Sequence, residues 1–199
     1  GNYAFYGCNG FTGKLTIPST YKSIGDFAFY GCSGFSGLVF QDTNFYKSKM
    51  DYIGNYAFYN CSGLSGSLLI TSLTRYIGVY SFAGCSGLDE LNISSNGDLS
   101  IGIHAFDKSN FTNLYYTNFK YGPIYQYPIG LNNNISIFVS NSYRDSNFAG
   151  YDIIYQDVPI DNFASNHYII NVTCKYTNVD ELIDSFHQTL DFYKSVDNT

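Results

Sequence analysis

Cysteine and histidine are the residues of this sequence with the most versatile chemistry, because they serve as metal ligands, nucleophiles and disulfide partners. The 199 residues include 5 Cys and 3 His. They contain neither a Cys-x-x-Cys pair nor a Cys–His cluster at zinc spacing, so we expect no metal site. Four of the cysteines occupy matching places in a repeated motif: Cys8, Cys32, Cys61 and Cys85.

Two interpretations of the repeated cysteine are open. Stacked repeats would bring neighbouring cysteines close enough for a disulfide bond. A residue that recurs identically in every unit is more often a small buried side chain that completes a turn, and we favour that role. The fifth cysteine, Cys174, stands outside the motif in an apolar segment, and we expect it to be buried there.

A nucleophilic cysteine would need Cys174 to lie near His167 or His187. No Asn or Asp with a recognisable orienting role accompanies these residues, and the chain has no P-loop, dinucleotide-binding fingerprint or nucleophile elbow. The third histidine, His104, takes a place that aromatic residues hold in other copies of the motif, so we expect a structural role. The sequence therefore predicts no catalytic residue, no cofactor and no enzyme.

The motif around the cysteines recurs through the first half of the chain. Its Phe anchors, at positions 5, 29, 58, 82 and 106, are 24, 29, 24 and 24 residues apart, which is the period of leucine-rich repeats. We expect these rings to form a continuous internal spine. The copies are Asn2-Tyr-Ala-Phe-Tyr-Gly-Cys8, Asp26-Phe-Ala-Phe-Tyr-Gly-Cys32, Asn55-Tyr-Ala-Phe-Tyr-Asn-Cys61, Val79-Tyr-Ser-Phe-Ala-Gly-Cys85 and a degraded Ile103-His-Ala-Phe-Asp-Lys-Ser109.

Short alternating segments between the motif copies must position any binding residues. Alternation of this length predicts a strand with one buried face, and stacked coils would pair these strands in a parallel sheet at about 4.8 Å. An Ile-Gly pair precedes the later copies, and we expect its Gly to permit a tight bend. The segments are Leu15-Thr-Ile17, Leu38-Val-Phe40, Leu68-Leu-Ile70, Leu91-Asn-Ile93 and Leu114-Tyr-Tyr116.

Three segments resemble a known repeat consensus. They are Leu15-Thr-Ile-Pro18, Ser23-Ile-Gly-Asp-Phe-Ala-Phe-Tyr-Gly-Cys32-Ser-Gly-Phe35 and Ile53-Gly-Asn-Tyr-Ala-Phe-Tyr-Asn-Cys61-Ser-Gly-Leu64. This pattern closely resembles the BspA-like, or Treponema-type, leucine-rich repeat of bacterial and protozoan surface proteins. The resemblance implies an extracellular or cell-surface, non-catalytic scaffold that adheres to host, matrix or neighbouring-cell proteins.

The predicted fold is an α/β-type solenoid of leucine-rich repeat coils, with a short-stranded parallel sheet and irregular convex return segments. Residues 1–117 form the array of about five units, of which the N-terminal unit is partial. An insertion in the 29-residue unit, at about 41–52, is expected to be a surface loop. Residues 118–158 would form a final irregular coil and C-terminal cap. The tail, 159–199, is predicted to hold one strand and, from about 179 to 195, one amphipathic helix.

The composition limits the classes of partner. Ten Lys and Arg against 16 Asp and Glu give a net charge of −6, and no basic run occurs, which argues against nucleic-acid and anionic-membrane partners. No apolar stretch approaches the roughly 18 residues of a membrane helix, so we expect no membrane insertion by this chain. The side chains that would point outward from the predicted strands are mixed and moderately apolar, which fits contact with a protein better than with a charged ligand.

Two surfaces are candidates for binding that partner. The first is the row of outward side chains between the paired apolar residues of the strands, and the second is the Tyr-rich stretch 115–127. The alternative function is a structural spacer that self-associates edge to edge without a specific ligand. The candidate binding residues are Thr16, Val39, Leu69, Asn92, Tyr115, Tyr121 and Tyr125.

Overall fold

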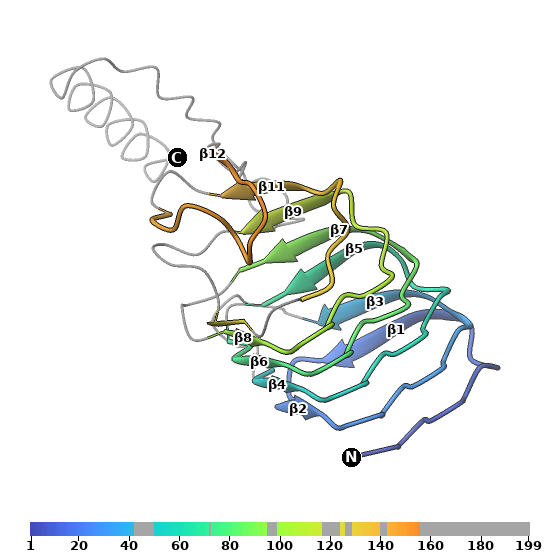
Figure 1. The fold of residues 1–199 in the computed structure, drawn as a ribbon. Helices are drawn as coiled ribbons and strands as arrows, with labels where there is room; N and C mark the ends of the chain where they lie inside the picture. The colour runs from blue at the N-terminus through green and yellow to red at the C-terminus, as the bar shows by residue number, and fades with distance from the viewer. Residues whose placement is uncertain are drawn as a thin grey trace, which may run out of the picture. The chain divides into compact units, whose positions relative to one another are not determined.

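The computed structural model divides the chain into two compact units, Gly1–Val158 and Pro159–Thr199. It describes residues 1–41, 50–71, 73–94, 99–116, 124–125, 129–139 and 143–155, all within the first unit. The strand and the amphipathic helix predicted for 159–199 lie outside the described residues, as does most of the predicted insertion loop. The described part of the chain is a stack of coils (Figure 1) whose elements are all strands, so its structure gives no support for the α component of the predicted fold class.

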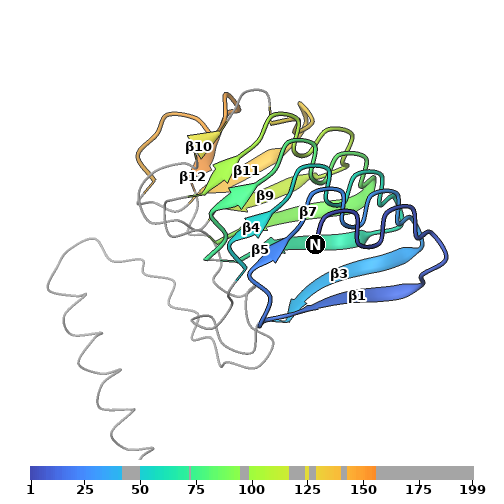
Figure 2. The same cartoon turned by 90° about the horizontal axis from the view of Figure 1, so that it is seen from below.

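One side of the stack is built from the predicted alternating segments, which confirms them as parallel strands. Each coil contributes one strand, and the strands run in the same direction across the stack (Figure 2). Two sheets result, in the orders β1-β3 and β12-β11-β9-β7-β5. The strands are β1 Gly13–Pro18, β3 Phe35–Gln41, β5 Ser65–Ile70, β7 Gly87–Ile93, β9 Asn113–Tyr116, β11 Ser136–Val139 and β12 Ile154–Tyr155.

The sheet is interrupted between β3 and β5, although these strands are neighbours in the stack. The Ser65 hydroxyl donates to the Ser36 carbonyl oxygen at 2.9 Å and links them. The interruption falls in the 29-residue unit, where the extra residues follow β3 directly. The loss of pairing thus coincides with the position of the insertion.

The return segments are more regular than the sequence predicts. They contain a second parallel sheet of two-residue strands, in the order β10-β8-β6-β4-β2. The return segments that were predicted to be irregular are therefore regular in part, because the Ile of each Ile-Gly pair lies in register with the Ile of the next coil. The strands are β2 Ser23–Ile24, β4 Tyr52–Ile53, β6 Tyr76–Ile77, β8 Ser100–Ile101 and β10 Ile124–Tyr125.

Glycine is required in the Ile-Gly pair for a different physical reason from the one expected. Gly54 does not have a positive φ, so the pair does not need the conformational freedom of glycine for a bend. A Cβ at this position would lie 2.6 Å from the backbone nitrogen of Asp26 in the preceding coil. The same clash recurs at Gly25, Gly78 and Gly102. Glycine is required because the backbones of successive coils approach each other too closely for a side chain.

The anchor phenylalanines form the predicted spine through the stack. Phe29 stacks on Phe58 with a centroid separation of 5.2 Å, and Phe58 on Phe82 with 5.1 Å. The spine extends to Phe5 at 5.1 Å and to Phe106 at 6.1 Å. All but Phe5 are buried. Since no coil covers both faces of its own ring, the spine joins neighbouring coils into one core.

The repeated cysteines complete turns, as favoured above. The Cys61 thiol donates a hydrogen bond to the Phe29 carbonyl oxygen of the preceding coil, with Sγ and O 3.0 Å apart, and Cys32 and Cys85 make equivalent bonds at 2.9 and 3.1 Å. The four motif cysteines are free thiols, which excludes the alternative of disulfides between coils. In the degraded copy Ser109 donates to the corresponding carbonyl at 3.3 Å, so its hydroxyl replaces the thiol.

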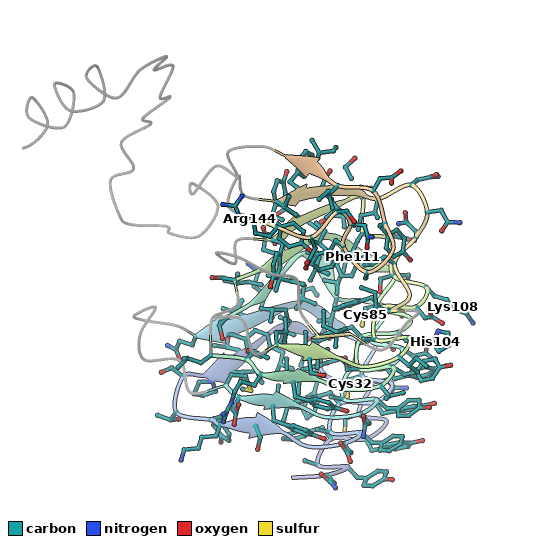
Figure 3. All side chains as sticks on the ribbon, turned by 60° about the vertical axis from the view of Figure 1, so that its left-hand side comes forward. Cys32, Cys85, His104, Lys108, Phe111 and Arg144 are labelled. Atoms are coloured by element: carbon teal, nitrogen blue, oxygen red, sulfur yellow. The ribbon has the colours of Figure 1, made fainter. Side chains whose placement is uncertain are left out.

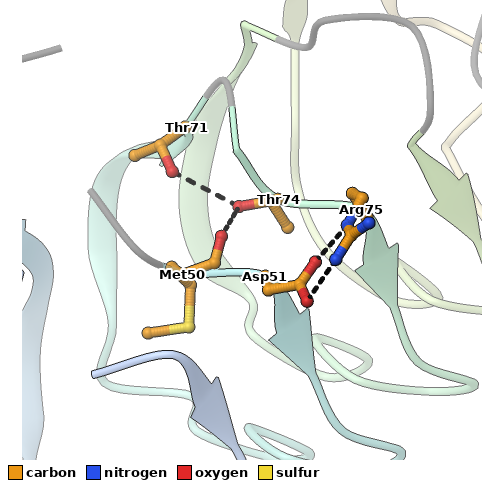
Figure 4. Close-up of polar contacts among 5 residues, drawn as sticks. All are labelled: Met50, Asp51, Thr71, Thr74 and Arg75. Atoms are coloured by element: carbon orange, nitrogen blue, oxygen red, sulfur yellow. Dashed lines mark hydrogen bonds and ion pairs between the residues drawn. The ribbon is translucent and has the colours of Figure 1, made fainter. Parts of the chain in front are cut away.

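Polar side chains also join the coils at the corner that follows the insertion. Arg75 forms a bidentate ion pair with Asp51, with distances of 2.6 and 2.8 Å (Figure 4). This hydrogen bonding from Arg75 lowers the pKa of the Asp51 carboxyl. Beside the pair, the buried Thr74 hydroxyl donates to the Met50 carbonyl oxygen at 3.3 Å and accepts from Thr71 at 3.3 Å. These contacts connect the coil that contains the insertion to the next one.

Candidate functional site

The predicted outward residues line up across the strands in one row, which we call the outer row. Thr16 pairs with Val39 in the first sheet. In the second sheet Leu69 pairs with Asn92, and Asn92 pairs with Tyr115. The backbone register therefore shows that Thr16 and Val39 are equivalent in one sheet, and that Leu69, Asn92 and Tyr115 are equivalent in the other.

Alternation along each strand turns the outer row away from the core. The residues on either side of Leu69 and Tyr115, such as Leu68 and Leu114, are fully buried. Leu69 and Tyr115 are partly exposed, Thr16 is exposed, and Val39 is 41% exposed. The sheet thus presents a row of mostly apolar side chains on its outer face, with the interruption between Val39 and Leu69.

Asn92 differs from the contact residue that the sequence predicts, because it is only 3% exposed. Its amide nitrogen donates to Ser67 Oγ and to Glu90 Oε1, both at 2.7 Å. The prediction of Asn92 as an exposed contact is therefore wrong, since a short polar side chain between two larger neighbours bonds along the sheet instead. Its role in the outer row is to fix Ser67 and Glu90 beside the apolar residues.

Two further residues, which the sequence prediction missed, continue the outer row. Phe138 of β11 pairs with Tyr115, and Ile154 of β12 pairs with Phe138. The rings of Tyr115 and Phe138 stack with centroids 4.9 Å apart and planes 14° apart, and Ile154 is 42% exposed. The available signal was the alternation Ile137-Phe138-Val139, which matches the earlier strands. Phe138 also follows Tyr115 after 23 residues, the same spacing that separates Leu69, Asn92 and Tyr115.

The second predicted surface, the stretch 115–127, is described only in part. Tyr115 belongs to the outer row, and the backbone of Tyr125 lies in β10, which pairs with β8 in the sheet of two-residue strands on the return side. Tyr121 lies outside the described residues. The structure places Tyr115 and Tyr125 on different sheets, so it does not bring them together in one row.

The groups with catalytic potential have structural roles in the described part of the chain. Burial raises the pKa of the Cys61 thiol to about 12 and that of Cys85 well above its ordinary value, so neither is a nucleophile near neutral pH. His104 stacks on Tyr80 at 4.9 Å, which confirms its predicted aromatic-like role. Cys174, His167 and His187 lie outside the described residues.

The described part of the chain also bears on two other kinds of site, metal centres and membrane-spanning helices. Within the described ranges, no group of three His, Cys, Asp or Glu side chains is arranged to hold a metal ion. Likewise, no helix of the described part is long and apolar enough to cross a membrane. The outer row is therefore the candidate binding site for which the described residues give the most detailed geometry.

Comparison with known proteins identifies the repeat. A family model described as "BspA type Leucine rich repeat region" matches residues 1–127 in 6 copies. Searches of curated proteins and of solved structures each find no match. The family match covers more than half of the chain and extends past the expected end of the array at 117, and its solenoids are typically non-catalytic scaffolds. The chain belongs to the BspA-type leucine-rich repeat family.

Proposed function

We propose that this chain is a non-catalytic binding module that holds a protein partner from a host, a matrix or a neighbouring cell against the outer row of its sheet. The family supports a repeat-based scaffold for protein binding or adhesion. Such a role requires an extracellular or cell-surface location, which is usual for the family. The observation that carries the proposal is the exposed apolar row itself, from Leu69 through Tyr115 and Phe138 to Ile154.

The chemistry of the outer row favours protein over charged ligands. The stacked rings of Tyr115 and Phe138 provide a rigid aromatic surface, and rigid aromatic side chains dominate the energetics of protein interfaces. The exposed Val39 and Ile154 extend this surface toward both ends of the row. Ser67 and Glu90, which the buried Asn92 holds in place, would supply hydrogen bonds that fix the orientation of the partner.

A pull-down from matrix and cell-surface extracts with the full chain tests the proposal. We expect the captured protein to be lost when Leu69 and Tyr115 are both replaced by Asp, because two buried carboxylates would oppose the interface. Leu73→Asp is the matched control, since Leu73 is 38% exposed but stands outside the row. Capture that survives the double substitution would contradict the proposed face.

A second candidate function is edge-to-edge self-association, and one observation favours it. The coil nearest the N-terminus exposes 42% of Phe5 and 44% of Phe11. These rings border a hollow of about 390 Å³ that Leu15 and Ile17 also line. A second copy could cover this apolar end. Sedimentation velocity over a wide concentration range would then show oligomers that Phe5→Asp abolishes, whereas a monomer at every concentration would exclude this function.

A further inference from the structure

Two ladders of aromatic rings run along the return side of the stack. In the first, Tyr3, Phe27, Tyr56, Tyr80 and His104 stack at 4.9 to 5.2 Å. All five have a positive φ between 54° and 57°, a conformation that is unusual for residues with a side chain. This regular backbone holds one ring per coil at the same place.

The second ladder is incomplete. Tyr6 stacks on Tyr30 at 4.7 Å, and Tyr30 stacks on Tyr59 at 4.9 Å. The next coil has Ala83 at the equivalent position, and the one after has Asp107. No ring of the described residues stacks on the second face of Tyr59, so the ladder lacks one ring at the level of Ala83.

A hollow of about 330 Å³ lies where that ring is missing. Tyr59 provides a wall, and the ring of Tyr80 stands at 72° to it with a centroid separation of 6.4 Å. Ala83 lies at the same level in the stack. The remaining lining includes Tyr56, Asn60, Gly84, Asp107 and Lys108. Figure 3 shows His104 and Lys108 on this same edge of the stack.

The width of the hollow fits one ring. The levels of Tyr59 and Asp107 are separated by two coils, or about 10 Å at the usual spacing of parallel strands. A six-membered ring midway between them would lie about 5 Å from Tyr59, close to the 4.9 Å that separates the rings of Tyr30 and Tyr59. An incoming ring would therefore complete the ladder.

The polar groups around the hollow decide which kind of ring it suits. Asp107 is an acceptor whose Oδ2 lies 3.0 Å from Nδ1 of His104, Lys108 is a donor, and the Asn60 amide is both. An aromatic hydrocarbon guest would form no hydrogen bond with these groups, whereas a guest that carries hydroxyl groups can bond to all three. Lys108 opposes a cation and Asp107 opposes an anion, so this pair of opposite charges favours a guest without net charge.

We propose that this hollow binds the ring of a neutral hexopyranose sugar, stacked on Tyr59 at the level of Ala83. The C–H bonds on one face of such a ring carry partial positive charge, and they complement the negative face of the Tyr59 ring. Its hydroxyl groups both donate and accept, so they match Asp107, Lys108 and Asn60 together. This site is on a different face from the outer row and is independent of the proposed protein binding.

Saturation-transfer NMR of the full chain with methyl glycosides of glucose, galactose and mannose tests this site. We expect at least one glycoside to bind with a millimolar Kd, with transfer concentrated on the C–H groups of one sugar face. Ala83→Tyr supplies the missing ring from the protein itself. It should weaken that binding at least about tenfold, the loss of a contact worth about 1.4 kcal/mol.

Two more variants keep the result decisive. If Ala83→Tyr does not fold, Tyr59→Leu removes the flat face while retaining an apolar side chain, and it should abolish binding. Tyr6→Leu is the matched control, because Tyr6 is 51% exposed at the far end of the same ladder. The proposal is overturned if no glycoside binds at about 100 mM, if Ala83→Tyr binds as well as the unmodified chain, or if tetramethylammonium competes for the hollow more strongly than the sugars.

Discussion

Replacement of Phe58 by Ala tests whether the phenylalanine spine holds the coils together. The Phe58 side chain is 0% exposed and stacks on rings from both neighbouring coils. Truncation of a buried Phe costs about 3–5 kcal/mol, and the two stacked contacts place this position near 4–5 kcal/mol. Each coil contacts only its neighbours, so one substitution weakens two interfaces.

Phe5→Ala is the matched comparison. Phe5 is 42% exposed and stacks within the spine only on Phe29, so its loss should cost about 1–2 kcal/mol. The difference of about 3 kcal/mol corresponds to a melting temperature roughly 6–12 °C lower for Phe58→Ala in a unit of this size. Urea titration followed by far-ultraviolet circular dichroism gives both free energies. Equal losses at the two positions would refute the spine as the link between coils.

Three further substitutions test other contacts between coils, each by urea titration. Gly54→Ala places a Cβ 2.6 Å from the Asp26 backbone nitrogen and should cost about 2–4 kcal/mol. Cys61→Ala removes one of the two donors to the Phe29 carbonyl oxygen, which keeps the Cys32 N–H. It should cost about 1–2 kcal/mol through the lost bond and the lost packing, whereas Cys61→Ser should cost less than about 1 kcal/mol. Val79→Asn should add about 1 kcal/mol by supplying a missing side-chain acceptor. Burial raises the Cys61 pKa to about 12, so the thiol ionises at a lower pH in the unfolded chain than in the folded one. The free energy of unfolding should therefore fall as the pH rises from about 9 to 12, and it should fall less in Cys61→Ser.

The chain offers a control for Gly54→Ala. Gly37→Ala tests a buried glycine without a positive φ, where the nearest contact of the new Cβ would be the flexible Lys14 side chain at 3.4 Å, so little change is expected. A loss equal to that of Gly54→Ala would contradict the close-approach explanation. The Val79 expectation rests on the Asn55 Oδ1 atom, which accepts the Val79 N–H at 2.8 Å. If Val79→Asn lowers stability, the corresponding contact does not form one coil further along.

Regular features of the repeat could be predicted from the sequence, because spacing alone determines them. The period of the Phe anchors predicts the spine, and the alternation of segments such as Leu68-Leu-Ile70 predicts both the strands and the direction of the outer row. The favoured structural role of the cysteines was also accessible, since Ser109 stands in their place in the degraded copy and retains a hydroxyl donor.

Other features depend on contacts between coils that no spacing reveals. The requirement for Gly54 comes from the distance to the backbone of the previous coil, so the sequence suggests a bend instead. The burial of Asn92 depends on its neighbours across the strands. Ile154 was missed because it follows Phe138 after only 16 residues, whereas Phe138 keeps the 23-residue spacing of the strand residues and was predictable from it. The hollow beside Ala83 depends on how Tyr59 and Tyr80 pack, although the motif alignment already places Ala83 opposite Tyr59.

Hydroxyl-radical footprinting of the full chain, alone and with its captured protein, tests the central claim most directly. It measures the accessibility of individual side chains, so it separates the outer row from the return side of the stack. We predict that the partner protects Leu69, Tyr115 and Phe138, whereas Tyr30, which belongs to the second aromatic ladder on the return side, keeps its reactivity. Protection of Tyr30 with no change at Leu69, Tyr115 and Phe138 would contradict the proposal that the outer row binds the partner.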